Sequence, residues 1–351
     1  MFKPRRHLLI CLSLVVAAGV AWLLLRDTAP DVAPAVKHGF NKALAQARNG
    51  QPGAARVLYQ QFARSDLPDS RRVRLHAELP NYPSPQALKL ADKDLHHPSP
   101  KVRQAAIQSV VALVPGGPRS LLLGPLLDDP EQSVRFAAAS ALLGLSPDDL
   151  GLYFGPLQQV LEQYQAVLKA RPDDVDSQYL LARLYLHNAD LKAAQQALER
   201  ALRLEPDNLR AVVLQVEVLD KQGQGDAARQ LLARQLQAHS DSAYLQHALG
   251  MWLLQHGQGE YALLGLSRAV ELEPDNPHYR YDLATTLHDE GELQAAQKQL
   301  QEIVQRQPAN RKARVLLINY WKESGQLQNV QVLLALLEQQ NPDDPALQQG
   351  L

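Results

Sequence analysis

Prolines recur through the second half of this 351-residue chain at a spacing of 34 residues or twice that. They stand at positions 172, 206, 274, 308 and 342, and Ser240 fills the remaining place in the series. Aligned on this period, five units begin at residues 175, 209, 243, 277 and 311. A period of this length is typical of proteins in which each unit is one supersecondary element and neighbouring units stack. The sequence therefore predicts a stacked array of repeats.

The five units share residue types at the same offsets, counted from the first residue of each unit. Offsets 7 and 8 carry small or apolar residues in nearly every unit (Leu181-Ala182, Gln215-Val216, Leu249-Gly250, Leu283-Ala284, Leu317-Ile318), as one face of a first helix requires. Offset 15 is Gly in four units and Ala189 in the first, at a place where a left-handed turn would end that helix. Offset 20 is Ala in four units and Val330 in the last, which lets a second helix approach the first closely. Proline at offset 32 cannot continue the second helix and ends the unit.

This pattern resembles the tetratricopeptide repeat over residues 175–344, about half of the chain. The Trp usual in that family at offset 4 is missing from every unit, where the residues are Gln178, Val212, Gln246, Arg280 and Arg314. The resemblance implies pairs of antiparallel helices, stacked so that the first helices line a concave groove that binds protein segments.

A second repeat lies upstream. Val102-Arg103-Gln104-Ala105-Ala106 follows a Pro-Ser-Pro turn, and Val134-Arg135-Phe136-Ala137-Ala138 follows Asp128-Asp129-Pro130, with Val73-Arg74 as a weaker third copy. The pattern resembles the HEAT repeat, whose Arg commonly binds the Asp-containing turn of a neighbouring repeat. Asp129 and Arg135 fit that role. The alternative is one more helical hairpin with an ordinary surface Arg, and either interpretation gives an α-solenoid.

The expected fold is therefore all-α, with HEAT-like repeats over residues 38–146, tetratricopeptide repeats over 153–344 and a tail over 345–351. HEAT-like repeats that run into tetratricopeptide units are similar to the C-terminal portion of large multihaem c-type cytochromes of bacteria. The single cysteine, Cys11, excludes a Cys-x-x-Cys-His haem site, so haem chemistry does not follow from that likeness.

The N-terminus has the charge pattern of a membrane anchor. A basic segment, residues 1–7, precedes an uncharged run of 18 residues, 8–25, which as a helix would span about 27 Å. The preceding basic residues place the N-terminus in the cytoplasm and the rest across the membrane, after a Pro/Ala-rich linker over 26–37. We expect an inner-membrane protein with a periplasmic C-terminal domain; cleavage after Ala35 is the alternative.

Composition argues against several classes of function. The net charge of −1 excludes a broadly basic nucleic-acid binder, and one cysteine excludes a disulfide framework or a Cys-based zinc site. No hydrolase, metalloprotease, nucleotide-binding or dinucleotide-binding motif is present in the sequence. The adjacent His96 and His97 point about 100° apart on a helix and suit free carbonyls at its end better than a metal. Acidic pairs at 128–129, 173–174 and 343–344 suit helix N-termini better than acid–base catalysis.

The remaining candidate site is the concave groove, which the resemblance assigns to offsets 2, 5, 9, 12 and 13 of the first helices. Aromatic and imidazole rings there offer contact area with few torsions to freeze, which suits a peptide segment. The alternative is that these polar rings solvate a face that binds nothing. The predicted groove residues are Tyr179, Arg183, His187, Arg210, Glu217, Tyr244, His247, Met251, His278, Tyr281, His288, Asn319 and Lys322.

The sequence therefore favours a noncatalytic, membrane-anchored scaffold or adaptor that binds protein segments or a subunit of an envelope complex. A sharper hypothesis is assembly of c-type cytochromes. No cofactor, metal, nucleic acid or small-molecule substrate is expected. The alternatives are an accessory subunit of a membrane or periplasmic redox enzyme and a purely structural spacer.

Overall fold

A computed structural model of the chain describes residues 39–348. The predicted basic segment, transmembrane helix and linker, 1–7, 8–25 and 26–37, lie outside the described residues. Within those residues the chain is all-α, without a strand, as expected. None of the helices described there is both long and apolar enough to cross a bilayer. From Phe40 onward the chain forms one compact unit, to which the following description applies.

The first part of this unit consists of short helices and 3-10 turns that lead to one longer helix. The elements are α2 (Phe40–Arg48), α3 (Ala54–Phe62), α4 (Asp69–Glu78), η1 (Leu79–Asn81), α5 (Pro85–Leu95), α6 (Pro100–Leu113), α7 (Pro118–Leu123), η2 (Gly124–Asp128), α8 (Gln132–Leu142), α9 (Pro147–Leu150), η3 (Gly151–Tyr153) and α10 (Phe154–Lys169). Helices α4, α6, α8 and α10 pack against one another in that order.

Five helix pairs of nearly constant length follow. They are α11 (Val175–His187) with α12 (Leu191–Leu204), α13 (Leu209–Lys221) with α14 (Gly225–Ala238), α15 (Ala243–Gln255) with α16 (Gly259–Leu272), α17 (Pro277–Asp289) with α18 (Leu293–Arg306), and α19 (Arg311–Glu323) with α20 (Leu327–Gln340). A short helix, α21 (Pro345–Gln348), lies within the stretch expected to be a tail.

Each first helix of a pair begins after a residue whose side chain caps it. Asp174, Asn208, Ser242, Asn276 and Asn310 accept a hydrogen bond from a backbone N–H two or three residues later. Asp344 accepts one from Ala346 at 2.9 Å in the same way. Such caps satisfy a donor that a helix N-terminus leaves free. The capping roles predicted for the acidic pairs 173–174 and 343–344 are confirmed at their second residues.

The turn inside each pair is left-handed at offset 15, as predicted. Gly223, Gly257, Gly291 and Gly325 have φ between 67° and 84°. In the first pair Ala189 adopts the same turn with φ of 57°, a conformation that costs an L-residue about 1–2 kcal/mol. The turn brings the two helices into contact, and the alanines at offset 20 are fully buried between them.

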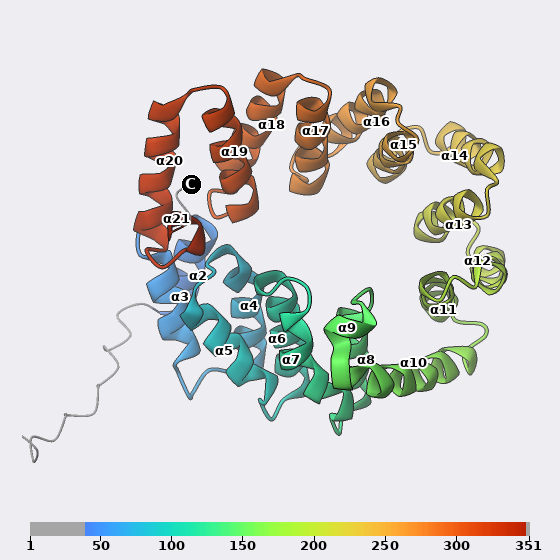
Figure 1. Cartoon of the computed structure of the whole chain (residues 1–351), viewed down its shortest axis with the longest axis horizontal. Coiled ribbons are helices and arrows are strands. Elements are labelled where there is room, and N and C mark those ends of the chain that lie inside the picture. The colour runs from blue at the N-terminus through green and yellow to red at the C-terminus, as the bar shows by residue number, and fades with distance from the viewer. Residues whose placement is uncertain (1–38, 349–351) are drawn as a thin grey trace, which may run out of the picture. The chain divides into compact units, whose positions relative to one another are not determined.

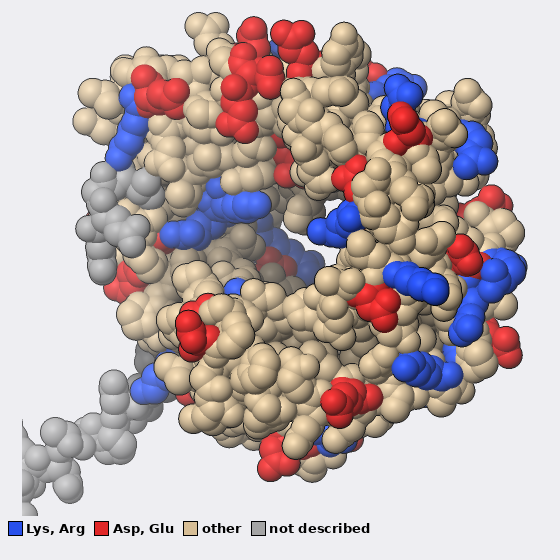
Figure 2. Space-filling view, turned by 45° about the vertical axis from the view of Figure 1, so that its right-hand side comes forward, with Lys and Arg blue, Asp and Glu red and all other residues tan. Residues whose placement is uncertain are grey.

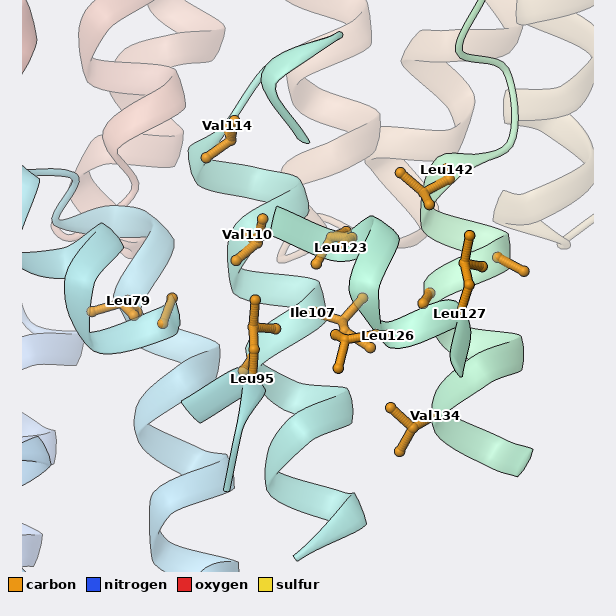
Figure 3. Close-up of a cluster of buried hydrophobic side chains, with 14 of the residues drawn as sticks. Leu79, Leu95, Ile107, Val110, Val114, Leu123, Leu126, Leu127, Val134 and Leu142 are labelled. Atoms are coloured by element: carbon orange, nitrogen blue, oxygen red, sulfur yellow. The ribbon is translucent and has the colours of Figure 1, made fainter. Parts of the chain in front are cut away.

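The hydrophobic core changes character along the unit. One continuous cluster runs from α2 to α13, whereas the later repeats hold three smaller clusters. Figure 3 shows part of the continuous cluster, where Ile107 and Val110 of α6 lie between Leu95 on one side and Leu123 and Leu126 on the other. The N-terminal half is therefore packed as one body, while the later repeats pack mainly with their neighbours.

Buried arginines link successive turns in the N-terminal half. The Arg103 guanidinium donates to the Asp129 carboxylate at 2.7 Å, and Arg72 donates to Asp94 at 2.6 Å. Arg135 donates to the backbone carbonyl of Asp129 at 2.7 Å, so it binds the Asp-containing turn as expected, through the main chain and not through the carboxylate that Arg103 holds.

The weaker copy of this pattern was placed two residues too late. Arg72, not Arg74, occupies the buried position, and Arg74 lies over the Phe40 ring at 5.4 Å. Of the two adjacent histidines, His96 ends α5 as expected, with Nδ1 against the Asp92 carbonyl oxygen at 3.2 Å.

The last repeat of the unit contacts the first helices (Figure 1). The Gly53 N–H donates to the Gln339 carbonyl oxygen at 2.7 Å, and the Asn341 side-chain amide donates to the Pro83 carbonyl oxygen at 2.7 Å. Ala309 is buried in the same cluster as the residues of α2 and α3. We call this set of contacts the seam, because it joins the end of the array to its beginning.

Gly50 shows how closely the backbones approach at the seam. A Cβ atom at this position would lie 2.8 Å from the Pro308 carbonyl oxygen, closer than such atoms normally pack. Gly50 also has φ of 55°, which favours glycine for a second reason. Beside it, the buried Arg314 donates to the Ala309 carbonyl oxygen at 3.2 Å and to the Gln340 side chain.

Candidate functional site: the concave face

The inner surface of this unit is formed by α4, α6, α8, α10 and the first helices of the repeats. A pocket of about 510 Å³ is lined by Asn81 and Ala112 on one side and by Tyr281, Lys312 and Asn319 on the other. The C-terminal end of α6 therefore faces α17 and α19 across the interior. Figure 2 shows the opening between the helices, with Lys and Arg side chains along its border. We call this inner surface the concave face.

Two of the predicted groove tyrosines are covered by a cation from the next repeat. The Arg210 guanidinium lies 4.4 Å from the Tyr179 ring centroid, and the Lys312 ammonium lies 3.9 Å from that of Tyr281. Both pairs join offset 5 of one repeat to offset 2 of the next, so the spacing of 31 residues sets the contact. Cation–π contacts of this kind contribute about 0.5–1 kcal/mol at exposed sites. A ligand on this face would therefore contact each ring together with the cation that covers it.

Tyr244 lies half-buried on the same face, and burial raises the pKa of its hydroxyl. Burial likewise raises the pKa of Tyr281. Both phenols are therefore neutral near pH 7 and can donate or accept a hydrogen bond.

Two predicted groove histidines pair with carboxylates one repeat further on. His247 Nε2 lies 2.7 Å from Asp282 Oδ2, and His288 Nε2 lies 2.8 Å from Glu323 Oε2. The hydrogen bond to Glu323 raises the pKa of His288, whose ring also stacks on Tyr320 at 4.2 Å. These imidazoles therefore join neighbouring repeats, and their contact with a partner stays a prediction.

The other predicted groove residues divide between the core and the open surface. Met251 packs against a buried cluster, and Glu217 lies 4.0 Å from Lys221 on its own helix. His278 and Asn319 are exposed, and Lys322 is half-buried. That the thirteen predicted residues form one binding groove stays a prediction.

A larger hollow lies on the concave face outside the predicted groove. It measures about 1010 Å³ and is lined by α4, α6, α8 and α10 through Asp69, Ser70, Val73, Lys101, Gln104, Ala105, Gln108, Ser133, Phe136, Ala137, Ser140 and Tyr164. The half-buried rings of Phe136 and Tyr164 lie against each other with centroids 4.3 Å apart. Sequence reasoning missed this site, although polar residues at 101, 104 and 108 follow one face of a helix.

A second hollow of about 290 Å³ continues the first toward the repeats. Both are lined by Ser140 and Tyr164, and the second adds Leu180, Arg183 and His187 of α11. Arg183 and His187 are thus the predicted groove residues that belong to this surface. We call the two hollows together the trough.

A buried cluster in the N-terminal half has the residue types of a hydrolytic triad. Burial lowers the pKa of His76; its Nε2 lies 3.0 Å from Asp94 Oδ2 and its Nδ1 lies 2.9 Å from the Ser109 hydroxyl, which donates to the His76 carbonyl oxygen at 3.1 Å. Arg72 binds the same carboxylate. Burial opposes ionisation of Asp94, but the hydrogen bonds from His76 and Arg72 prevail and lower its pKa. Ser109 and His76 are each 3% exposed or less, so no substrate reaches them and the cluster holds α4 to α5 and α6.

Among residues 39–348, no group of three or more His, Cys, Asp or Glu side chains is placed to hold a metal ion.

Comparison with solved structures gives partial likenesses. The protein YrrB, described as a tetratricopeptide-repeat protein with an unusual peptide-binding site, is 20% identical over 54% of this chain and 98% of its own, with a TM-score of 0.37. A thermophilic tetratricopeptide-repeat protein of Thermus thermophilus, TTC0263, is 20% identical over 58% and 98%, with a TM-score of 0.41. Yeast Tom70 is 13% identical over 86% and 60%, with a TM-score of 0.48. A search of curated proteins found no match.

Two family models, both described as tetratricopeptide repeat, match residues 159–194 and 188–251. Their matches begin within α10 and end in α15, so they cover the first two predicted units and the start of the third. Neither match includes the HEAT-like region, whose assignment stays a prediction, as does the likeness to cytochromes. Together the two matches span residues 159–251, and over that stretch the chain carries tetratricopeptide repeats.

Proposed function

We propose that this chain is a noncatalytic scaffold that binds an extended segment of a protein partner on its concave face. The observation that carries this proposal is the trough, whose larger hollow measures about 1010 Å³ and has a half-buried aromatic pair in its lining. A long, shallow surface with aromatic anchors and adaptable amides suits a peptide better than a compact small molecule.

The test is crosslinking in intact cells, followed by purification through a C-terminal tag and mass spectrometry. The chain with Tyr179, Tyr244 and Tyr281 changed to Ala serves as the groove variant. The matched control is Tyr261→Ala, because Tyr261 is 65% exposed on α16, a second helix of a repeat. A partner retained by the control and lost by the groove variant supports binding on the repeats.

A partner that both variants retain moves the binding surface to the trough or the N-terminal segment. The absence of a partner from the unchanged chain would overturn the scaffold proposal and favour a spacer.

The location of the protein is a second part of the proposal. We propose that residues 8–25 anchor the chain in the inner membrane, with the helical unit in the periplasm, on the strength of the uncharged run and its basic flank. A reporter enzyme active only in the periplasm, fused after the last residue, should be active. It should lose activity when residues 1–38 are removed, and an active truncated fusion would contradict the proposal.

The class of partner follows from that location. An envelope protein, such as a component of c-type cytochrome assembly or a redox complex that this chain serves as an accessory subunit, is the finer hypothesis. Its support is the order of the repeats in the sequence. Purification of only cytoplasmic partners would contradict it.

A further inference from the structure

We infer that the trough binds an extended, acidic segment of a partner protein, with one aromatic or large aliphatic side chain placed against Phe136 and Tyr164. This inference rests on the proposed scaffold function and adds the site and the chemistry of the ligand. It assigns the main contact to α6, α8, α10 and α11 rather than to the tetratricopeptide groove that the sequence indicated.

Charge is the first argument. Lys101 lines one part of the trough and Arg183 another, and neither forms an ion pair with a carboxylate among residues 39–348. The acidic residue that lines the trough is Asp69 of α4. Other concave-face cations are engaged, since Arg210 and Lys312 cover tyrosine rings. Lys101 and Arg183 therefore remain to meet carboxylates of a ligand.

The aromatic pair is the second argument. Phe136 and Tyr164 are half-buried at the junction of α8 and α10, with ring planes inclined by 31°. Both line the larger hollow, and Tyr164 and Ser140 also line the smaller one that holds Arg183. An apolar ligand side chain at this junction would be flanked by cations on both sides. The trough thus selects for a carboxylate, an apolar residue and a second carboxylate in that order.

The amides of α6 are the third argument. Gln104 and Gln108 lie one turn apart on the face that also carries Lys101, and both line the hollow. An amide side chain offers a donor and an acceptor together, which matches a peptide group of an extended chain. These contacts are independent of ligand sequence, so they hold the backbone while the cations and rings select side chains.

The length of the ligand follows from helix spacing. The trough crosses from α4 over α6, α8 and α10 to α11, and packed helices lie about 8–10 Å apart. Four such steps make about 32–40 Å, which an extended chain at about 3.3 Å per residue covers with about ten to twelve residues.

The experiment uses the full-length chain in detergent micelles and three fluorescent twelve-residue peptides, read by anisotropy. The first peptide alternates Glu and Leu around a central Trp, the second replaces Glu with Lys, and the third keeps Glu but replaces the apolar residues with Ser. The first should bind at least tenfold more tightly than either of the others, and added salt should weaken it. Equal binding of the acidic and basic peptides would overturn the inference.

Variants then locate the site. Arg183→Gln and Phe136→Ala should each weaken binding of the first peptide at least tenfold. The matched control, Arg229→Gln on α14, should change it less than twofold, because Arg229 is exposed on a second helix beside Asp226. Far-UV circular dichroism checks that each variant stays folded; Arg183 is an exposed side chain, so its variant stays informative if Phe136→Ala unfolds. Equal weakening by Arg229→Gln and Arg183→Gln would overturn the inference.

A photocrosslinking residue in place of Gln108 separates the two proposals in cells. Suppose that Arg183→Gln leaves both the identity and the amount of the crosslinked partner unchanged. In that case the scaffold proposal is supported and the inference of an acidic ligand is wrong. If no crosslink forms and the unchanged chain purifies without a partner, the scaffold proposal itself fails.

Discussion

Gly50→Ala should weaken the seam more than its backbone angle alone explains. An alanine at φ of 55° costs about 1–2 kcal/mol in the left-handed region. The added Cβ would also lie 2.8 Å from the Pro308 carbonyl oxygen and 3.0 Å from the Ala309 nitrogen, which are backbone atoms that cannot rotate away. Overpacking of this kind costs about 1–3 kcal/mol more, so we expect a total loss of about 2–5 kcal/mol.

Gly116→Ala is the matched control, because Gly116 has φ of 56° and no atom within 4 Å of a Cβ placed there. Urea unfolding compares the two variants, and spin labels at Gln51→Cys and Gln339→Cys in a Cys11→Ser background report the distance across the seam. The seam should lengthen only in Gly50→Ala. Equal losses of stability, together with an unchanged label distance, would refute the reasoning.

Three further changes test the buried and inter-repeat contacts. Asp94→Asn leaves the buried arginine beside it unpaired and should cost about 3–5 kcal/mol in urea unfolding, and a loss under about 1 kcal/mol would contradict that network. Ala189→Gly relieves a left-handed alanine and should raise the Tm by calorimetry, whereas the equivalent Gly223→Ala should lower it; a fall for Ala189→Gly would show that the turn is unstrained. The Glu323 contact raises the pKa of His288, so its stabilisation is complete below the ordinary histidine pKa of about 6.5 and is lost as pH rises through the folded value. Glu323→Gln should return the His288 titration, followed by NMR, toward the ordinary value, and an unchanged titration would mean that the pair does not form.

The part of the fold that the sequence predicts well is the part that repeats every 34 residues. The left-handed turn at Gly223 and the helix cap at Asn208 recur at the same offsets in every unit, because each helix pair must end and restart in the same way. Periodicity also explains the buried offset 4, where Arg280 and Arg314 stand in place of an aromatic residue and bond to the preceding turn. Local rules suffice for features that a single repeat determines.

Features that depend on distant parts of the chain escape such rules. The Asn341–Pro83 contact joins residues 258 positions apart, and no local pattern marks either residue. The trough depends on how α6, α8 and α10 pack, so Phe136 and Tyr164 become neighbours only in the fold. His247 and His288 pair with carboxylates one repeat further on, and no local pattern marks those partners.

The helix pairs bury different numbers of side chains. The pair that buries the fewest, α13 with α14, lies away from both ends of the array. Helix α14 buries only Ala228 and Leu232 among its 14 residues, whereas α12 buries four. A linear repeat protein usually frays from its ends, but here the last pair is held against α2 and α3. Local opening should therefore begin at α14, where backbone amides would exchange with solvent first. An opening there would allow a long chain segment to enter the interior sideways while both ends of the array stay closed.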